Sequence, residues 1–350
     1  MTQQRRPTLL DVARLAMVSP KTVSRVVNGE SNVREDTAHR ILEAMSTLGY
    51  RRNSAAWQLR TGHRTTYIGL VIDDLENPFY SRVARGVEQI VREHDAVLVI
   101  GSSEEAPERE RELIRQLAER RVDGLLLVPA GHGDQRFLAA EIEMGMAVVC
   151  LDRPPVGIRT DTVLLDNAGG ASLGLDYLIA RGCRRVAVLG DSLDIYTMRE
   201  RLAGFDASAI RAGMLIDPAL QVTDVHTPQQ AATVVGQMLI GPRPPDGFFC
   251  ANNRLTVGVV AEAARLQADT VIVGFDDFEL ASALPMDLAL VSGDERELGR
   301  CGARLLFDRL HNPGRRRRRT VLPTQLFIRG LPRDAFRRTG HALGAPDRAI

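Results

Sequence analysis

The sequence has few cysteines, a single tryptophan and no long apolar run. None of its apolar stretches approaches the roughly 18 residues of a membrane-spanning helix, and the N-terminal segment lacks the shorter apolar stretch of a secretory signal. The cysteines lie far apart, form no C-x-x-C pair and have no histidine pair nearby, so we expect buried thiols in a reducing cytoplasm. We expect neither disulfides nor a bound metal or cofactor. The four cysteines are Cys150, Cys183, Cys250 and Cys301.

The net charge is small but unevenly distributed along the chain. Residues 1–64 carry eleven Lys and Arg against five Asp and Glu, whereas the remainder carries 34 against 39. A small basic segment on a mildly acidic body is the charge pattern of a nucleic-acid-binding protein, although a solvated basic face gives the same totals. The 350 residues, 44% of them hydrophobic, suffice for two or three globular domains.

Three short helices are expected in residues 1–50. Thr8 can cap the first, with Asp11 returning the capping hydrogen bond. Ser19 and Pro20 begin the second, because serine is a good N-cap and proline suits the first helical position. Its buried stripe is Val23, Val26 and Val27. The third is expected over residues 34–48, ends at Gly49, and buries Ile41, Leu42 and Met45.

Two short helices joined by a tight turn indicate a helix-turn-helix. The second helix leaves small polar and basic side chains on one face, as a helix that enters the DNA major groove requires. Arginine can pair with guanine, and hydroxyls can reach bases or phosphates. A plain three-helix bundle with an exposed polar face remains the alternative. The residues on this face are Lys21, Thr22, Ser24, Arg25 and Asn28.

Residues 8–53 resemble the DNA-binding domain of the lac repressor (LacI/GalR) family. The core of the resemblance is V-S-x-x-T-V-S-R-V-x-N, residues 18–28. Met17 departs from the family, which usually has glycine at this turn; if its φ is positive, methionine costs roughly 1 kcal/mol. The resemblance implies that DNA is bound by Thr8, Leu9, Ser19, Pro20, Lys21, Thr22, Ser24, Arg25, Asn28, Asn53, Ala56 and Leu59.

Residues 51–64 resemble the hinge helix of that family, which folds in the minor groove when two chains lie side by side on an operator. The resemblance makes Asn53 its cap, Ala56 the point of close approach to the partner hinge, and Leu59 the wedge that kinks the duplex. Arg52 stands where the family usually has proline. Trp57 either stacks at the partner hinge or the DNA backbone, or lies on the surface.

From residue 65 onward, short apolar runs alternate with amphipathic stretches. This alternation predicts parallel sheets covered on both faces, and the number of runs favours two Rossmann-like lobes with a cleft between them. We therefore expect an α/β body of two lobes after the all-α head, and the resemblance to the lac repressor family implies that this body is similar to the periplasmic binding proteins. The expected strands are 67–72, 96–100, 124–128, 147–151, 163–165, 186–189, 247–251, 271–275 and a closing strand 321–328. The expected helices are 78–92, 107–120, 169–180, 198–212, 228–239, 254–265 and 295–310.

The expected domains are a head at 1–50, a hinge at 51–64, a body at 65–340 and a tail at 341–350. Lobe 1 is assigned about 65–164 plus 293–324, and lobe 2 about 165–292 plus 325–340. The segment after Gly330, residues 331–350, lacks the leucine heptads that make some members of the family tetramers, so we expect a homodimer. The arginine run at 315–319 is explained more simply as a solvated loop than as a second DNA contact.

Polar residues follow several expected strands, where α/β sheets bind ligands. The resemblance implies that Phe79 stacks on an effector, Arg201 donates to its oxygens, and Asp276 accepts from its hydroxyls. Helix capping or a bridge between the lobes is the alternative role. Gly293 replaces a frequent polar residue of the family, so the ligand can differ from the commoner sugars. The expected effector-binding residues are Asn77, Phe79, Asp152, Arg153, Thr197, Arg201, Asn252 and Asp276.

An enzyme is the main alternative. Residues 190–193 spell the G-D-S-L motif of a serine esterase family, and Asp308 and His311 supply its D-x-x-H. That motif belongs near the start of its domain, whereas here it follows a mid-chain strand. A sugar-binding receptor without regulation is opposed by the head and by the lack of a signal peptide.

The sequence therefore predicts a cytoplasmic transcriptional regulator, most simply a repressor, and not an enzyme. It would bind a pseudo-palindromic double-stranded operator as a homodimer and respond to a small sugar-like effector. A purine or another non-sugar metabolite is the alternative effector.

Overall fold

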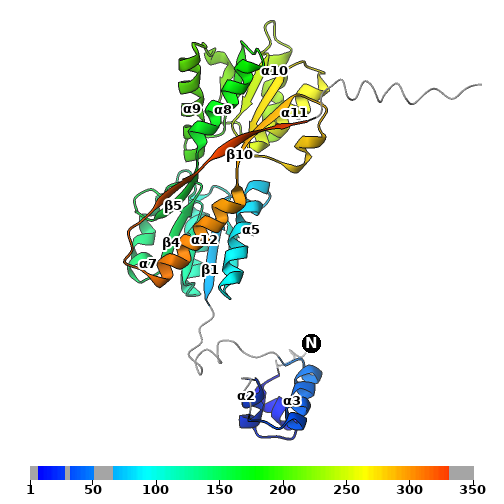
Figure 1. Ribbon diagram of the computed structural model, residues 1–350, viewed down its shortest axis with the longest axis vertical. Coiled ribbons are helices and arrows are strands. Elements are labelled where there is room, and N and C mark those ends of the chain that lie inside the picture. The colour runs from blue at the N-terminus through cyan, green and yellow to red at the C-terminus, as the bar shows by residue number, and fades with distance from the viewer. Residues whose placement is uncertain (1–6, 28–31, 51–65, 331–350) are drawn as a thin grey trace, which may run out of the picture. The chain divides into compact units, whose positions relative to one another are not determined.

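The computed structural model describes residues 7–27, 32–50 and 66–330, and the chain divides into two compact units, Met1–Thr65 and Thr66–Ile350 (Figure 1). Within the described ranges, no helix is long and apolar enough to cross a membrane.

The first unit is a small three-helix domain. Its helices are α1 (Leu9–Leu15), α2 (Pro20–Val27) and α3 (Glu35–Leu48), and α3 ends at Gly49 with φ 62°. One apolar cluster joins all three helices, because each places its small or branched side chains on the inner face. Its fully buried members are Val12, Ala13, Ala16, Val23, Ile41 and Ala44.

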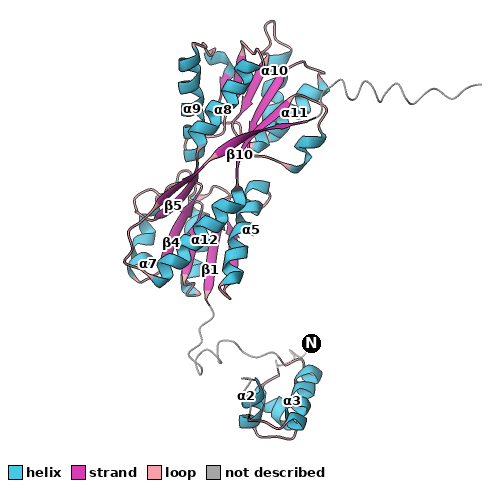
Figure 2. Cartoon of the chain, viewed as in Figure 1, coloured by secondary structure: helices cyan, strands magenta, loops and turns pink. Residues whose placement is uncertain are grey.

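The second unit contains two six-stranded sheets, one in each lobe, with helices on both faces (Figure 2). The lobe 1 sheet has the order β11-β5-β4-β3-β1-β2 and is wholly parallel. Its strands are β1 (Tyr67–Ile72), β2 (Val97–Ser102), β3 (Gly124–Leu127), β4 (Ala147–Leu151), β5 (Asp161–Leu165) and β11 (Arg319–Leu322). Its helices are α5 (Pro78–Glu93), α6 (Pro107–Glu119), α7 (Ala139–Glu143) and α12 (Glu295–His311), with the 3-10 turn η1 (Gln135–Leu138).

Lobe 2 repeats this architecture with the order β12-β10-β9-β8-β6-β7, in which β12 alone is antiparallel. Its strands are β6 (Val186–Leu189), β7 (Gln221–Val222), β8 (Gly247–Cys250), β9 (Val271–Phe275), β10 (Leu288–Gly293) and β12 (Thr324–Arg329). Its helices are α8 (Asn167–Ala180), α9 (Tyr196–Ala212), α10 (Pro228–Leu239) and α11 (Asn253–Arg265), with η2 (Pro218–Leu220) and η3 (Glu279–Ala283). The expected α/β fold with two lobes and an all-α head is confirmed.

The chain passes between the lobes three times, after β5, after β10 and after β11. The last crossing corrects the sequence interpretation, which read residues 321–328 as one strand. Pro323 separates β11 in lobe 1 from β12 in lobe 2, since proline has no N–H to donate to a ladder. The prediction also missed β10, whose burial on both faces leaves no alternation in its sequence.

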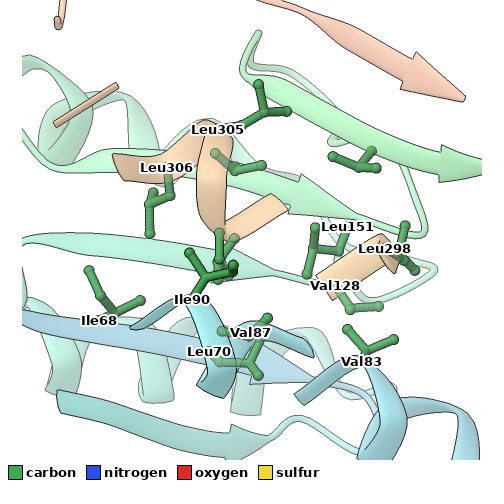
Figure 3. Packing of buried hydrophobic residues seen from close by; sticks show 14 of the residues in the cluster. Ile68, Leu70, Val83, Val87, Ile90, Val128, Leu151, Leu298, Leu305 and Leu306 are labelled. Carbon is green, nitrogen blue, oxygen red and sulfur yellow. The ribbon is translucent and has the colours of Figure 1, made fainter. Parts of the chain in front are cut away.

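Lobe 1 is held together by a core between its sheet, α5 and α12 (Figure 3). Ile90 and Val87 of α5 and Leu306 of α12 are fully buried there. The two helices approach closely because glycines face each other's backbone: a Cβ at Gly299 would collide with the carbonyl oxygen of Val83. This packing anchors the two segments of lobe 1, although some 200 residues separate them in the sequence.

Three of the four cysteines are buried, as expected, and all four are free thiols. Cys301 is only half-buried, which corrects the expectation for that residue. Its position on α12 lies at the edge of the lobe 1 core, where the helix begins to face solvent.

Candidate functional site: a DNA-binding head and an interlobe cleft

The head has the geometry of a helix-turn-helix. Thr8 caps α1, and Asp11 returns the bond, with Thr8 N donating to its carboxylate at 2.8 Å. Ser19 Oγ accepts from the Thr22 N–H at 3.1 Å, and Pro20 begins α2. Both caps are as expected. They fix the angle between α1 and α2, which determines how the polar face of α2 meets a groove.

On that face Lys21 is exposed, and Thr22, Ser24 and Arg25 are half-buried. Leu9 is half-buried at the edge of the head's core. The predicted DNA-binding residues Asn28, Asn53, Ala56 and Leu59 lie outside the described residues, as does Trp57.

The turn between α1 and α2 contains Met17 at φ 52°, in the left-handed region that glycine adopts most readily. Its side chain is 84% exposed, so it gains little packing in return. Methionine is therefore costly at this position.

One expectation for the core of the head was wrong. Leu42 is 56% exposed, and Ala44 takes its place in the core beside Ile41. Met45 is only half-buried.

In the second unit, a cavity of about 910 Å³ lies between the lobes. The carboxyl ends of parallel strands from both sheets face it, because β4 and β9 each end just before a lining residue. All eight effector-binding residues expected from the sequence line this one cavity. They are Asn77, Phe79, Asp152, Arg153, Thr197, Arg201, Asn252 and Asp276.

A buried ion pair forms the lobe 2 wall. Arg201, 4% exposed, donates to Asp276 at 3.1 and 3.3 Å. The same guanidinium donates to Asn167 Oδ1 at 2.8 Å and to the Ala251 carbonyl at 2.7 Å, and lies 3.7 Å from the centroid of the Phe275 ring. Burial raises the pKa of Asp276, opposed by the adjacent Arg201 charge. The pair therefore presents carboxylate oxygens in a fixed position at the cavity surface.

A second buried guanidinium, Arg153, occupies the lobe 1 wall. It donates to the Pro129 carbonyl and to the Tyr80 hydroxyl, both at 3.1 Å, and forms an ion pair with Glu105. Asp152 Oδ1 is buried without a hydrogen-bond partner in the described structure. Burial raises the pKa of Asp152. This wall thus contains an acceptor that a bound hydroxyl or amine would satisfy.

Asp73, which also lines the cavity, has a strongly raised pKa. Desolvation, and then the nearby charge of Glu105, raise its pKa to about 7, against the lowering effect of Arg153. Asp73 follows the end of β1. With this pKa, its carboxyl group changes charge near neutral pH.

Two of the expected residues also have structural roles. Asn77 caps α5, accepting from the Phe79 N–H at 3.1 Å, and its Oδ1 also accepts from Asn253 Nδ2 of lobe 2 at 2.9 Å. Asn252 caps α11, accepting from the Leu255 N–H at 2.9 Å. The capping and interlobe roles left open by the sequence are thus both present. Phe79 is 4% exposed and packs edge-on against Tyr80, so only part of its ring faces the cavity.

Sequence reasoning missed several lining residues, notably Glu105, Asp191 and His226. His226 Nδ1 lies 2.6 Å from Asp191 Oδ1, although 35 residues separate them in sequence. Asp191 could have been found from the sequence, because it lies two residues after the end of β6. Asp73 and Asp276 likewise follow the ends of β1 and β9. The loop that carries His226 has no such pattern.

The esterase motifs do not form a site. Ser192 borders the cavity, and its hydroxyl donates to Asp194 at 3.2 Å. His311 ends α12, and its Nδ1 lies 2.7 Å from the Phe307 carbonyl. α12 runs from the cleft to the opposite end of lobe 1, so its last residues cannot serve as the base for a serine in the cleft.

Comparison with known proteins gives two family matches. Residues 8–53 match "Bacterial regulatory proteins, lacI family", and residues 175–330 match "Periplasmic binding protein-like domain". The ribose operon repressor of Escherichia coli (strain K12) is 32% identical over 328 residues, covering 92% of this chain and 99% of that protein. The transcriptional repressor PurR of Aliivibrio fischeri is 28% identical, with 89% and 94% covered.

Among solved structures, the chain is similar to the lac repressor dimer bound to operator and the anti-inducer ONPF. The identity is 26% and the TM-score 0.75, with 94% of this chain and all of that chain covered. The matches span both the head and the body of the chain.

Proposed function

Because this chain belongs to the lacI family of bacterial regulatory proteins and is a DNA-binding transcriptional repressor with an effector-binding domain, we propose that it binds a neutral, sugar-like effector in the interlobe cleft. The carrying observation is the buried Arg201–Asp276 pair at the cavity surface. A carboxylate held by a guanidinium accepts from vicinal hydroxyls, while the one remaining N–H of Arg201 donates to a ring or hydroxyl oxygen.

The charges of the cavity favour a neutral polyhydroxyl ligand over a sugar acid. Eight carboxylates line it, against four guanidiniums and two histidines, so an added carboxylate would meet repulsion. Most of the acids already have a cationic partner: Asp74 pairs with Arg254, Glu104 with Arg109, and Glu105 with Arg153. The lining acids are Asp73, Asp74, Glu76, Glu104, Glu105, Asp152, Asp191 and Asp276.

A purine is the second candidate, since the similar PurR proteins are named for purine regulation. The observation in its favour is the aromatic pair Phe79 and Tyr80 beside Asp152, which offers an apolar surface and an acceptor together. A purine needs a ring face for stacking, however, and both rings are almost completely buried. The sugar therefore fits the cavity better.

For the assembly we propose a homodimer, in which a second copy covers β2. This edge strand pairs only with β1 and exposes apolar side chains at Val97, Val99 and Ile100. An uncovered apolar edge invites association. The similar lac repressor was solved as a dimer on its operator, and two heads would match a pseudo-palindromic site. Val99→Arg should give a mass near 38.5 kDa by light scattering and weaken operator binding, whereas Ile210→Arg on α9 should leave the dimer intact.

The proposed regulation is a change in lobe closure. The lobes are linked by crossing strands and by side-chain contacts across the cleft, so a ligand that contacts both walls alters their equilibrium. The closure would then alter the spacing of two heads and the affinity for DNA, by a coupling of about 1–3 kcal/mol. The site of action is the cytoplasm, where the operator lies. The proposal includes no catalytic activity.

One experiment tests the effector claim. An operator is selected from a randomised duplex library with the full-length protein, and its binding is followed by anisotropy while pentoses, hexoses, sugar acids and purine bases are added singly. A neutral sugar should shift the operator affinity about 5- to 150-fold, and the shift should vanish in Asp276→Asn. A response to a purine base alone would replace the sugar proposal, and a response to none would remove it.

A further inference from the structure

The end of lobe 1 opposite the cleft carries an unusual concentration of arginine. We call it the arginine edge, defined as Arg159, Arg309, Arg315, Arg316, Arg317 and Arg318. These residues come from the loop before β5, the end of α12 and the run that precedes β11. They meet because β5 and β11 are parallel neighbours that begin at this end.

A single buried carboxylate organises this edge. Asp161, fully buried at the start of β5, accepts from Arg309 at 2.8 and 3.1 Å and from Arg315 at 2.9 and 3.0 Å. It also accepts from the Arg318 backbone N–H at 2.7 Å. The side chain of Arg315, the first residue of the arginine run, is 10% exposed, whereas residues 316–319 are exposed, as expected for a solvated loop. One carboxylate facing two guanidiniums leaves a positive charge uncompensated.

Tethering the run at both ends points its middle outward. Arg319 donates to the Tyr196 hydroxyl at 3.3 Å. The guanidinium of Arg318 lies 4.0 Å from the carboxylate of Asp308. Arg316 and Arg317 are exposed, and their side chains have no hydrogen-bond or ion-pair partner among the described residues. The same is true of Arg159.

Arg159 and Arg317 line a small pocket of about 160 Å³, together with Arg309 and the buried Asp161. The pocket can hold a group of phosphate size, and its three guanidiniums outnumber its one carboxylate. Two exposed guanidiniums beside a shallow, partly apolar pocket match the geometry in which arginine holds phosphate oxygens. The floor is formed by Ile142, Met146, Val148, Leu310 and Pro313.

The position of the edge relates it to DNA. All strands of the lobe 1 sheet are parallel, so β1 begins at the end where β4, β5 and β11 begin (Figure 1). Tyr67, the first residue of β1, is 17 residues beyond Tyr50, the last described residue of the head. Even a fully extended segment of that length spans only about 60 Å. The chain that comes from the head therefore enters lobe 1 at the same end as the arginine edge.

We propose that the arginine edge binds phosphate groups of the DNA backbone that flanks the operator. The contact would be independent of base sequence and would add to the affinity supplied by the head, because each neutralised phosphate releases counterions. The proposal rests on the DNA binding of this chain and not on the identity of the effector. Free phosphate is the other source of the same chemistry.

The test uses the full-length double variant Arg159→Gln/Arg317→Gln and the operator selected above, in a short duplex ending at the site and in a long duplex with about 15 extra base pairs on each side. On the long duplex, affinity should fall roughly 1.5- to 5-fold per arginine removed, as for exposed ion pairs. The slope of log K against log[salt] should lose about 0.9 per lost contact. On the short duplex the variant should equal the wild type, which shows that the head still functions.

The matched control is Arg184→Gln/Arg243→Gln, which removes the same charge from exposed arginines before β6 and β8, at the outer end of lobe 2. It should bind both duplexes as the wild type does. Equal losses in both double variants would mean a nonspecific effect of net charge and would overturn the proposal. Free phosphate is probed with inorganic phosphate and pyrophosphate. One outcome is that either anion raises the melting temperature of the wild type but not of Arg159→Gln/Arg317→Gln, while the DNA affinities of the two proteins stay equal. That result would show that the pocket binds a free anion and not the flanking backbone, and it would overturn the proposal.

Discussion

Asn253 Nδ2 of lobe 2 donates a hydrogen bond of 2.9 Å to Asn77 Oδ1 of lobe 1, across the mouth of the cleft. Other contacts lie alongside it: Arg82 donates to the Asp277 carbonyl at 3.0 Å, and Asp74 pairs with Arg254. The lobes are therefore linked directly by side chains, and these links contribute to the balance between closed and open forms.

Asn253→Ala should weaken the binding of an effector that requires the closed cleft. It removes one interlobe hydrogen bond, worth about 0.5–1.5 kcal/mol, so the Kd should rise roughly two- to tenfold. Calorimetric titration measures the change. Arg265→Ala is the control, because Arg265 is exposed at the end of the same helix, α11, and pairs with Glu262 of lobe 2. If Asn253→Ala binds like the wild type, the interlobe bond has no part in closure.

Breaking the Arg201–Asp276 pair should have separable effects on folding and on binding. Asp276→Ala leaves a buried guanidinium without its partner, so the free energy of unfolding should fall by about 3–5 kcal/mol. The double variant Arg201→Met/Asp276→Leu should recover most of that loss, since both charges are gone. Denaturant unfolding measures the stability. The double variant should still lack the effector response, and a restored response would show that the pair serves only the fold.

Arg25→Ala should reduce binding to the selected operator far more than binding to random DNA. A bidentate base contact contributes roughly 1–3 kcal/mol of discrimination, whereas a phosphate contact affects every sequence alike. Competition titrations at fixed salt concentration compare the two. Equal losses on both duplexes would identify Arg25 as a phosphate contact.

Asp73 should make the stability of the body depend on pH. Its pKa is raised to about 7 by burial and by Glu105, so between about pH 4 and 7 the folded chain retains a proton that the unfolded chain has lost. This contribution to the free energy of unfolding therefore falls as pH rises through that window. Asp73→Asn should be more stable than the wild type at pH 8, with the difference shrinking toward pH 4, as measured by thermal unfolding across pH. A constant difference would contradict the raised pKa.

Met17→Gly should stabilise the head by up to about 1 kcal/mol, because φ is 52° and the side chain is 84% exposed. The gain is limited by the greater freedom of glycine in the unfolded chain. Hydrogen exchange of the α1–α3 amides in the full-length protein reports the local opening free energy. Met17→Val should shift exchange in the opposite direction, since a β-branched residue fits positive φ poorly.

Local patterns made much of the fold predictable. The cap at Thr8, the break at Ser19 and Pro20, and the periodicity of residues 228–239 each depend on neighbours in sequence, and the structure has all three. Prediction failed where the pattern was uniform or the partner distant. Leu42 fits a helical stripe but faces solvent, because the three helices close around Ala44 instead.

The sequence by itself determined the helix-turn-helix and the alternation of strands and helices, because spacing along the chain and turn chemistry act between residues close in sequence. The eight expected cavity residues were implied by the resemblance to the lac repressor family and not by spacing. Only the tertiary structure decided that Arg153 meets Tyr80, that Asn77 meets Asn253, and that one buried carboxylate, Asp161, binds arginines some 150 positions away. Such contacts depend on which strands become neighbours and on what is desolvated between them, and no local pattern encodes that.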